Sequence, residues 1–344
     1  MITGRATAVA PANIAFVKYW GLRDVERILP MNGSISLCLD ACLTTTSVAF
    51  DTALDQDIVT LTLYDQAPQP ATGNARKRVV DHLDRLRALA GTTSRASVMS
   101  SNTFPSDAGI ASSAAAFAAL TLAGSAALGL SLDTADLSRL ARRSGSGSAS
   151  RSIPDGYVEW RVGDDQTSIA ETIAPPQHWH LCDVVAVVDT QAKKIGSAEN
   201  HRLAATSPYF DVRMAEIPRR IAAVRQAIAR RDLELLGTAI EAEAVSMHVV
   251  CMTQTPPSWY WSAGTLAVIH AVQAWRAAGL AAYFTIDAGP NVHVICAASD
   301  QAEVRRRLGL LPEVAFTLTN GPGHGARLLA PGSPGALVGQ ASYI

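Results

Sequence analysis

The sequence predicts an α+β fold with two domains. The chain has 344 residues, and a typical domain takes about 150. Several predicted strands precede the first long helix, which is typical of an α+β fold rather than of a doubly wound sheet. Pro175 and Pro176 mark the best boundary, because paired prolines interrupt any regular element. We therefore expect domains at residues 1–176 and 177–330, followed by a loose tail at 331–344 that is rich in Gly, Pro, Ser and Ala.

The first half is expected to contain four strands and one long helix. Residues 5–13 predict a strand that runs into a proline-marked loop, and β-branched residues predict strands at 34–39 and 44–50. Residues 58–64 alternate between apolar and polar side chains, as a half-exposed antiparallel strand should. Apolar residues at helical spacing predict a helix over 76–90.

The second half is expected to form a small sandwich with helices on one face. Its pattern mixes strands and helices instead of separating them. The predicted strands are 183–189, 283–286 and 292–296, and the predicted helices are 217–229, 233–246 and 262–278.

Charge and composition exclude several classes of protein. The chain has 29 Lys+Arg and 30 Asp+Glu, so it lacks the basic surface of a nucleic-acid binder. With 48% hydrophobic residues it is too apolar for a disordered chain. The start lacks the layout of a signal peptide, and Gly and Ser interrupt the apolar stretch 114–130, which favours a buried core helix over a membrane span. We expect a cytoplasmic protein with small-molecule partners and with neither nucleic-acid nor membrane partners.

The cysteines, one histidine pair and the arginine clusters fit ordinary structural roles. The five cysteines are scattered without a Cys-x-x-Cys pair, which favours buried free thiols over disulfides. His178 and His180 have no third ligand pattern, so a metal site is not expected there. Arginine clusters at 219–220, 230–231 and 305–307 lie on predicted helices and are expected to form solvated faces.

Two loops rich in glycine and serine carry the main chemical signal. In segment 105–117 a glycine turn and two hydroxyl side chains, Ser112 and Ser113, directly precede an alanine-rich helix. The free N–H groups at such a helix start form an anion site, although this loop alone fits an ordinary capped helix equally well. Segment 144–152 holds five serines, two glycines and Arg151, whose planar fork suits a carboxylate or a phosphate. A linker has a similar composition, but here a strand follows. The two loops together favour phosphate chemistry, and neither matches the P-loop or dinucleotide motifs.

With the N-terminal motif Asn-Ile-Ala-x-x-Lys-Tyr-Trp-Gly and the turn Asp-Ala-Gly-Pro-Asn, these loops resemble the GHMP kinase superfamily and, within it, the mevalonate diphosphate decarboxylases. The resemblance covers about residues 5–330, and its main segments are 11–36, 104–120, 145–160 and 287–291. It implies the GHMP kinase fold, with an N-terminal ribosomal-protein-S5-like nucleotide-binding domain and a C-terminal ferredoxin-like α/β sandwich. ATP would bind in the first half and the substrate in the cleft between the halves.

The resemblance also implies a reaction and a set of roles. ATP and Mg²⁺ serve to phosphorylate a tertiary 3-hydroxyl, after which phosphate and CO₂ leave together and an alkene remains. Asp287 would contact that hydroxyl as base or orienting group with Lys18 beside it, although from its turn alone it fits an Asx-type turn residue. Arg151 would clamp the substrate carboxylate next to Asn13. Further substrate contacts are implied for Tyr19, Ser146, Gly147, Ser148 and Ser197, and nucleotide contacts for Pro105, Ala108, Gly109, Ala111, Ser112, Ser113 and Arg76, with Ser112 also a Mg²⁺ ligand.

Two positions depart from the family pattern at the substrate's terminal phosphate. Leu22 and Ala198 stand where the family usually carries a lysine and often an arginine. A charged hydrogen bond contributes about 1.5–3 kcal/mol, so two losses would weaken diphosphate binding strongly. This predicts mevalonate 5-phosphate as substrate and isopentenyl phosphate as product.

Three alternatives stay open on the sequence. Arg23, His201 or Arg202 could supply the missing charge and keep mevalonate 5-diphosphate as the substrate. A mevalonate 3-kinase without decarboxylation has no need of the retained Asp287, Lys18 and Arg151 set. A non-catalytic small-molecule sensor would be expected to lose this aspartate or the serine-rich loops. Family members are often homodimers, which nothing in this sequence demonstrates.

Overall fold

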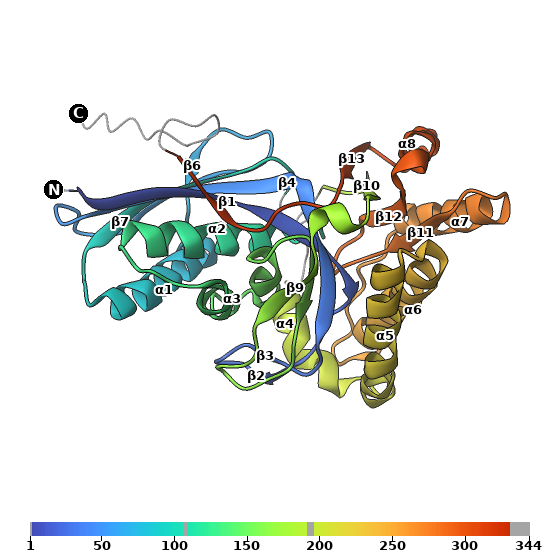
Figure 1. The fold of residues 1–344 in the computed structure, drawn as a ribbon, viewed down its shortest axis with the longest axis horizontal. Coiled ribbons are helices and arrows are strands. Elements are labelled where there is room, and N and C mark those ends of the chain that lie inside the picture. Colours follow the sequence, from blue (N-terminus) through green and yellow to red (C-terminus); the bar gives the residue numbers. More distant parts are fainter. Residues whose placement is uncertain (1, 106–108, 191–195, 331–344) are drawn as a thin grey trace.

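The computed structural model describes residues 2–105, 109–190 and 196–330, which form two sheets with helices around them (Figure 1). The larger sheet has the order β14-β1-β4-β7-β5-β6, and β8 pairs with β4 and β9. Its strands are β1 (Ile2–Val17), β4 (Ser34–Asp51), β5 (Ile58–Thr62), β6 (Gln69–Pro70), β7 (Arg95–Asn102), β8 (Tyr157–Trp160), β9 (Ala170–Ala174) and β14 (Arg327–Leu329). A short hairpin joins β2 (Leu22–Asp24) to β3 (Leu29–Pro30).

Strands β1 and β4 are longer than the sequence predicted. The loop expected near residue 11 is wrong, because Pro11 lies within β1 opposite Leu43, and a register shift follows before Asn13. Proline donates no hydrogen bond, so a strand tolerates it beside such an irregularity. The two strands predicted at 34–39 and 44–50 are the two ends of β4, which pair with β8 and β7 respectively.

Strand β5 pairs antiparallel with β6, as predicted for 58–64, but it runs parallel to β7 on its other side. Helix α1 (Gly73–Ala90) connects β5 to β7. A crossover through a helix brings the chain back in the same direction and therefore pairs the strands in parallel. The alternation of apolar and polar side chains predicts that one face is exposed, but it does not predict the direction of a neighbouring strand.

Helices α1, α2 (Ser112–Ala127) and α3 (Thr134–Arg142) lie on one side of the larger sheet (Figure 1). Most of α2 is buried, so the expected core helix in this apolar stretch is confirmed. Its alanines pack against Val48, Phe50 and Val98 of the sheet. A short helical turn, η1 (Gly147–Ser152), follows α3 and carries Arg151.

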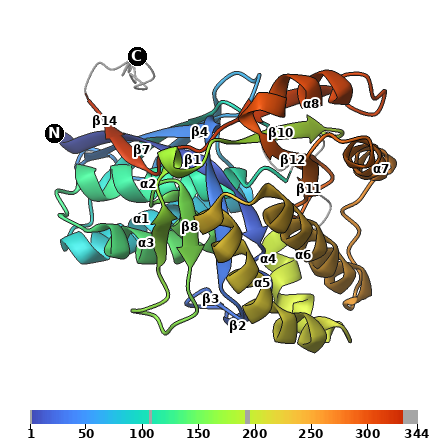
Figure 2. The same cartoon turned by 45° about the vertical axis from the view of Figure 1, so that its right-hand side comes forward.

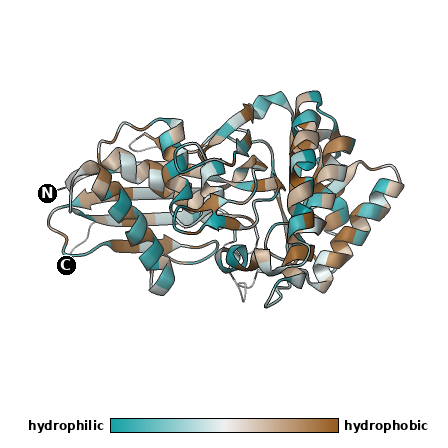
Figure 3. Cartoon of the chain, turned by 90° about the horizontal axis from the view of Figure 1, so that it is seen from below, coloured by the Kyte–Doolittle hydropathy of each residue, from teal (hydrophilic) through white to brown (hydrophobic). Residues whose placement is uncertain are grey.

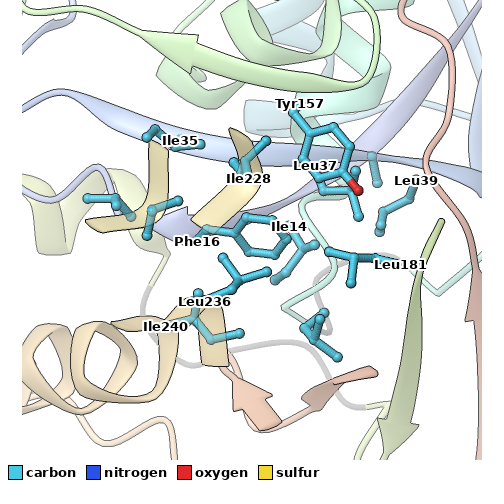
Figure 4. Packing of buried hydrophobic residues seen from close by; sticks show 14 of the residues in the cluster. Ile14, Phe16, Ile35, Leu37, Leu39, Tyr157, Leu181, Ile228, Leu236 and Ile240 are labelled. Atoms are coloured by element: carbon cyan, nitrogen blue, oxygen red, sulfur yellow. The ribbon is translucent and has the colours of Figure 1, made fainter. Parts of the chain in front are cut away.

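The smaller sheet has the order β11-β12-β10-β13, and helices cover both of its faces instead of one. Helices α7 and α8 pack on one face, and α5 and α6 pack on the other together with β1 and β4. Figure 2 shows α5 and α6 side by side, and Figure 4 shows Leu236 and Ile240 beside Phe16 of β1. The elements are β10 (Leu181–Val187), α4 (Ser197–Leu203), α5 (Phe210–Arg230), α6 (Leu233–Thr253), α7 (Ala263–Ala277), β11 (Ala282–Thr285), β12 (Val292–Ala297), α8 (Gln301–Leu308) and β13 (Phe316–Asn320), with short turns η2 (Pro176–His178), η3 (Ala204–Thr206) and η4 (Ala298–Asp300).

Helices α5 and α6 both extend beyond their predicted ends. Helix α5 begins before Pro218, which therefore lies inside the helix. The Asp232 side chain accepts the Leu235 N–H at 2.9 Å and so caps the start of α6. By length and composition α6 could cross a membrane, but half of its most apolar window is buried inside the protein, as in a core helix.

The cysteines and the surface follow the composition. All five cysteines are buried and free, as the sequence predicted. Figure 3 shows hydrophilic and hydrophobic residues alternating along the helices, as helices with one buried face require. The predicted tail at 331–344 lies outside the described residues, and the predicted boundary near residue 176 stays a prediction.

Candidate active site

A buried ion pair joins the two halves of the chain. Lys18 follows the end of β1, and its Nζ lies 2.6 Å from Oδ1 of Asp287, which follows β11. The same ammonium donates to the Ala15 carbonyl and to Thr285 Oγ1, both at 2.7 Å. The lysine side chain is 2% exposed and the aspartate 19%, so the carboxylate faces outward from the pair. Burial lowers the pKa of Lys18, and the Asp287 carboxylate opposes that effect.

Arg151 is another charged side chain of this site, and it is also buried. Its Nε donates to Asn13 Oδ1 at 3.2 Å, and its Nη1 donates to Ser34 Oγ at 2.6 Å. Asn13 in turn donates to Ser152 Oγ at 2.8 Å and to the Ser148 carbonyl at 3.2 Å. Burial lowers the pKa of the Arg151 guanidinium to about 10, so it stays charged at neutral pH. The fork is thus held in one orientation, which is what bidentate carboxylate recognition needs.

The two glycine-serine loops meet each other and the Asp287 turn. Ser113 Oγ lies 3.0 Å from Ser146 Oγ, which lies 3.4 Å from Ser148 Oγ. Gly109 has a φ of +85°, and a Cβ there would lie 3.0 Å from the Cα of Gly289. A larger residue at either glycine would push the first loop away from the turn that carries the aspartate.

The start of α2 is suited to an anion. Ala111 adopts a left-handed conformation before Ser112 and provides no side-chain cap. The first N–H groups of the helix, together with its dipole and the two serine hydroxyls, therefore form a donor set for phosphate oxygens. Pro105 is buried at the start of the loop, whereas the predicted contact Ala108 lies outside the described residues.

Arg76 does not approach these loops. It lies in the first turn of α1, where its Nη2 donates to the Asp57 carbonyl at 3.0 Å. The nearby Arg78 instead lies over the Phe117 ring of α2, 4.6 Å from its centroid, and beside Gly145. Arg78 therefore lies beside the second loop, and the nucleotide contact expected for Arg76 stays a prediction.

The other end of the site is aromatic. The Tyr19 ring stacks on His201 of α4 with centroids 4.0 Å apart, and its edge meets Trp160 at 4.8 Å. Gly147 lies against both rings, since a Cβ there would be 2.8 Å from Trp160 and 3.0 Å from Tyr19. Ser197 precedes His201 by one helical turn and so lies on the same side of α4.

Of the three candidate replacement cations, His201 lies at this aromatic end, and it supplies no charge there. His201 Nδ1 accepts the Gly21 N–H at 3.2 Å, and burial lowers its pKa to about 3, so it is neutral. Arg23 is exposed and donates to the Gly163 carbonyl, and Arg202 is exposed on α4. Leu22 packs beside the cluster of Tyr19, Cys38, Val158, Trp160 and Ala170. The lysine pair at 193–194 lies outside the described residues.

Several residues of this site were not predicted. Thr285 Oγ1 accepts a hydrogen bond from Lys18 Nζ. Glu243 accepts one from the main-chain N–H of Lys18, and Arg213 donates one to the Lys18 carbonyl. His248 is buried about one and a half turns after Glu243, and burial lowers its pKa to about 4. The available signal was a glutamate and a histidine inside a long apolar helix, where each needs a partner.

A hollow of about 630 Å³ lies elsewhere and includes none of the predicted site residues. It is lined in part by Asp40, Gln177, His180 and Asn320. In the described part of the chain no three His, Cys, Asp or Glu side chains cluster as a metal site. Ser112 as a ligand of a divalent ion stays a prediction.

The fold, the serine-rich loops at a helix start and the buried Lys18–Asp287 pair define an enzyme of the GHMP kinase superfamily. Residues 10–170 match the diphosphomevalonate decarboxylase-like N-terminal domain, and residues 183–316 match the mevalonate 5-diphosphate decarboxylase C-terminal domain. The chain belongs to the diphosphomevalonate decarboxylase family, and it is thus a decarboxylase, as expected.

Relatives and solved structures agree with this assignment. The diphosphomevalonate decarboxylase of Aspergillus fumigatus is 36% identical over 83% of this chain and 75% of its own length. The human diphosphomevalonate decarboxylase is 34% identical over the same shares. The Staphylococcus aureus mevalonate diphosphate decarboxylase has a TM-score of 0.88 at 34% identity, covering 96% of this chain and 99% of that one. A complex of MDDEF with MVAPP, AMPPCP and magnesium has a TM-score of 0.87 at 36% identity, covering 95% and 99%.

Proposed function

We propose that the chain converts mevalonate 5-diphosphate and ATP into isopentenyl diphosphate, ADP, phosphate and CO₂. The relatives' substrate carries this proposal: the named relatives are diphosphomevalonate decarboxylases, and a similar structure binds MVAPP with an ATP analogue and magnesium. The monophosphate predicted from Leu22 and Ala198 finds no support in these relatives. The buried free thiols support a reducing compartment such as the cytoplasm.

At the reacting end, the proposed roles follow from three charged side chains. Asp287 would accept a hydrogen bond from the 3-hydroxyl and hold or remove its proton, because its carboxylate is the exposed member of the pair. Lys18 keeps that carboxylate oriented. Arg151, fixed by Asn13 and Ser34, would hold the substrate carboxylate until CO₂ leaves.

The start of α2 and the two loops fit ATP with Mg²⁺. Ser112, Ser113, Gly109 and N–H groups at the start of the helix would hold the phosphates, since no side chain caps this helix start. When bound, ATP supplies the phosphoryl group that turns the 3-hydroxyl into a leaving group. The contact between Gly109 and Gly289 keeps this loop beside the Asp287 turn. Tyr19, Ser146, Gly147, Ser148 and Ser197 are proposed to surround the rest of the substrate.

Mevalonate 5-phosphate is a second candidate substrate, and a specific observation favours it. The side chain that lies against the Tyr19 and Trp20 rings is the neutral His201, not a cation. An extra phosphate bound beside it would gain no charged partner from this side chain, which disfavours the diphosphate.

One assay separates these candidates. Purified enzyme with ATP and Mg²⁺ is given mevalonate, mevalonate 5-phosphate or mevalonate 5-diphosphate, and ADP and CO₂ are followed separately. The proposal expects CO₂ from the diphosphate with the highest kcat/KM. A kcat/KM about a hundredfold higher for the monophosphate would establish the second candidate, and ADP without CO₂ from every substrate would leave a kinase.

A further inference from the structure

Helix α6 places a glutamate against the main chain of the catalytic lysine. Glu243 is fully buried, and its Oε1 accepts the Lys18 N–H at 3.0 Å. The Lys18 carbonyl accepts from Arg213 Nη2 at 3.0 Å and from Asn32 Nδ2 at 2.9 Å. The peptide groups on both sides of Lys18 are therefore held by side chains instead of by a neighbouring strand.

The glutamate is the centre of a buried charged cluster. Its Oε1 accepts from Arg213 Nη2 at 2.5 Å, and its Oε2 accepts from Arg220 Nη1 at 2.7 Å. Arg220 was expected on a solvated face, but it turns inward from α5, and its neighbour Arg219 is the exposed one. A buried ion cluster stabilises a fold weakly, because desolvation offsets the attraction. The placement of this cluster against Lys18 therefore indicates that it positions the lysine.

The cluster connects the two halves at the reacting atoms. Lys18 comes from the first half, whereas Glu243, Arg213 and Asp287 come from the second. Because Glu243 of α6 holds the Lys18 main chain, the lysine ammonium is placed where it contacts Thr285 and Asp287. A shift of about 1 Å in such a group can cost about a hundredfold in rate.

We propose that Glu243 is a positioning residue of this active site, which holds the main chain of Lys18 so that the lysine ammonium meets Asp287. The inference rests on the proposed function, since it assigns Glu243 a part in the same decarboxylation. Glu243 reaches the reaction only through Lys18, and its effect must therefore appear in the rate and the pH profile rather than in ATP binding.

The charge of Glu243 gives the proposal a second readout. The groups around Lys18 are the carboxylates Asp287 and Glu243, the guanidinium groups Arg151 and Arg213, and the neutral His248. Burial lowers the pKa of Lys18, both carboxylates raise it, and Arg151 lowers it further. Removing the charge of Glu243 must lower that pKa again, so that Lys18 loses its proton at a lower pH.

Three variants of the whole enzyme test this. Glu243→Gln keeps an oxygen for the Lys18 N–H but removes the charge, and Glu243→Asp keeps the charge but withdraws the carboxylate by one methylene. Arg220→Met is the matched control, because it removes an ion pair at Oε2 of the same carboxylate, whereas the Lys18 N–H is accepted by Oε1. For each variant, kcat, KM for ATP and the pH profile of CO₂ release are measured, with thermal unfolding as the check on folding.

The expected results differ among the variants. Glu243→Asp lowers kcat about tenfold or more with the alkaline limb at its wild-type pH, and Glu243→Gln lowers kcat and moves that limb to lower pH. Arg220→Met stays within about threefold in kcat, and KM for ATP is unchanged in all three. A wild-type kcat in Glu243→Asp would overturn the inference, also where Glu243→Gln fails to fold. A wild-type enzyme that releases no CO₂ from any substrate would instead refute the proposed function.

Discussion

The two ends of the substrate site are built on opposite principles. At the reacting end, Lys18, Asp287 and Arg151 are charged, and each is held by specific partners. At the far end, Tyr19 and His201 stack as neutral rings. Fixed charge is costly to bury and is therefore expected where bond cleavage needs it. In the proposed function the neutral end contacts the part of the substrate that does not react, so substrate choice can change there without loss of chemistry.

The largest expected effect comes from removing the charge at the reacting end. Asp287→Asn keeps the shape of the side chain but can no longer hold a proton, and it leaves Lys18 without its counter-ion. We expect kcat to fall about a thousandfold or more, whereas ATP binding, measured by calorimetry, changes little. Turnover near the wild-type rate would mean that Asp287 has no part in the mechanism. The charged end would then not be the reacting end.

The second effect concerns the arginine fork. Arg151→Lys keeps the charge but cannot reproduce the two directed bonds to Asn13 and Ser34. We expect kcat/KM for CO₂ release to fall about a hundredfold, since the substrate carboxylate is no longer fixed. Arg23→Lys, on the exposed hairpin, is the control and should leave kcat/KM unchanged. Equal behaviour of the two variants would show that charge, not geometry, matters at position 151.

The neutral end should appear in the pH dependence of stability. The pKa of His201 is about 3 in the folded chain and about 6.5 in the unfolded chain. Unfolding therefore takes up a proton at pH values between these two. The contribution of neutral His201 to the free energy of unfolding is complete above pH 6.5 and is lost as the pH falls toward 3. At pH 5 the loss is about 2 kcal/mol.

His201→Phe keeps a ring against Tyr19 and cannot titrate. It will lower stability by a constant amount, since the Gly21 N–H loses its acceptor, but the free energy of unfolding should then decline less steeply from pH 7 to pH 5. Denaturant unfolding at several pH values measures this slope. A slope equal to that of the wild type would mean that folding does not lower the pKa of His201.

The smallest effect concerns substrate choice. Leu22→Lys restores the cation typical of the family on the partly exposed β2 hairpin. We expect the ratio of kcat/KM for the diphosphate to that for the monophosphate to rise about tenfold, the low end for one charged hydrogen bond. Leu22→Met is the neutral control and should leave the ratio unchanged. No rise with the lysine would mean that position 22 does not face the terminal phosphate.

Local patterns in the chain were enough for much of the fold and for the reacting groups. The strand and helix periodicities, the helix start at Ser112 and the buried free cysteines are confirmed. The motif around Lys18 and the Asp287 turn also led to the family. Each of these signals resides in a few consecutive residues, whose spacing reports directly which side is buried.

Contacts between distant residues had to come from the tertiary structure. Glu243 lies 225 positions from the Lys18 main chain that it holds, and no spacing rule relates the two. The parallel pairing of β5, the inward turn of Arg220 and the neutral state of His201 have the same origin. Strand direction, helix rotation and pKa depend on which neighbours exclude water from a group, and only the assembled chain determines those neighbours.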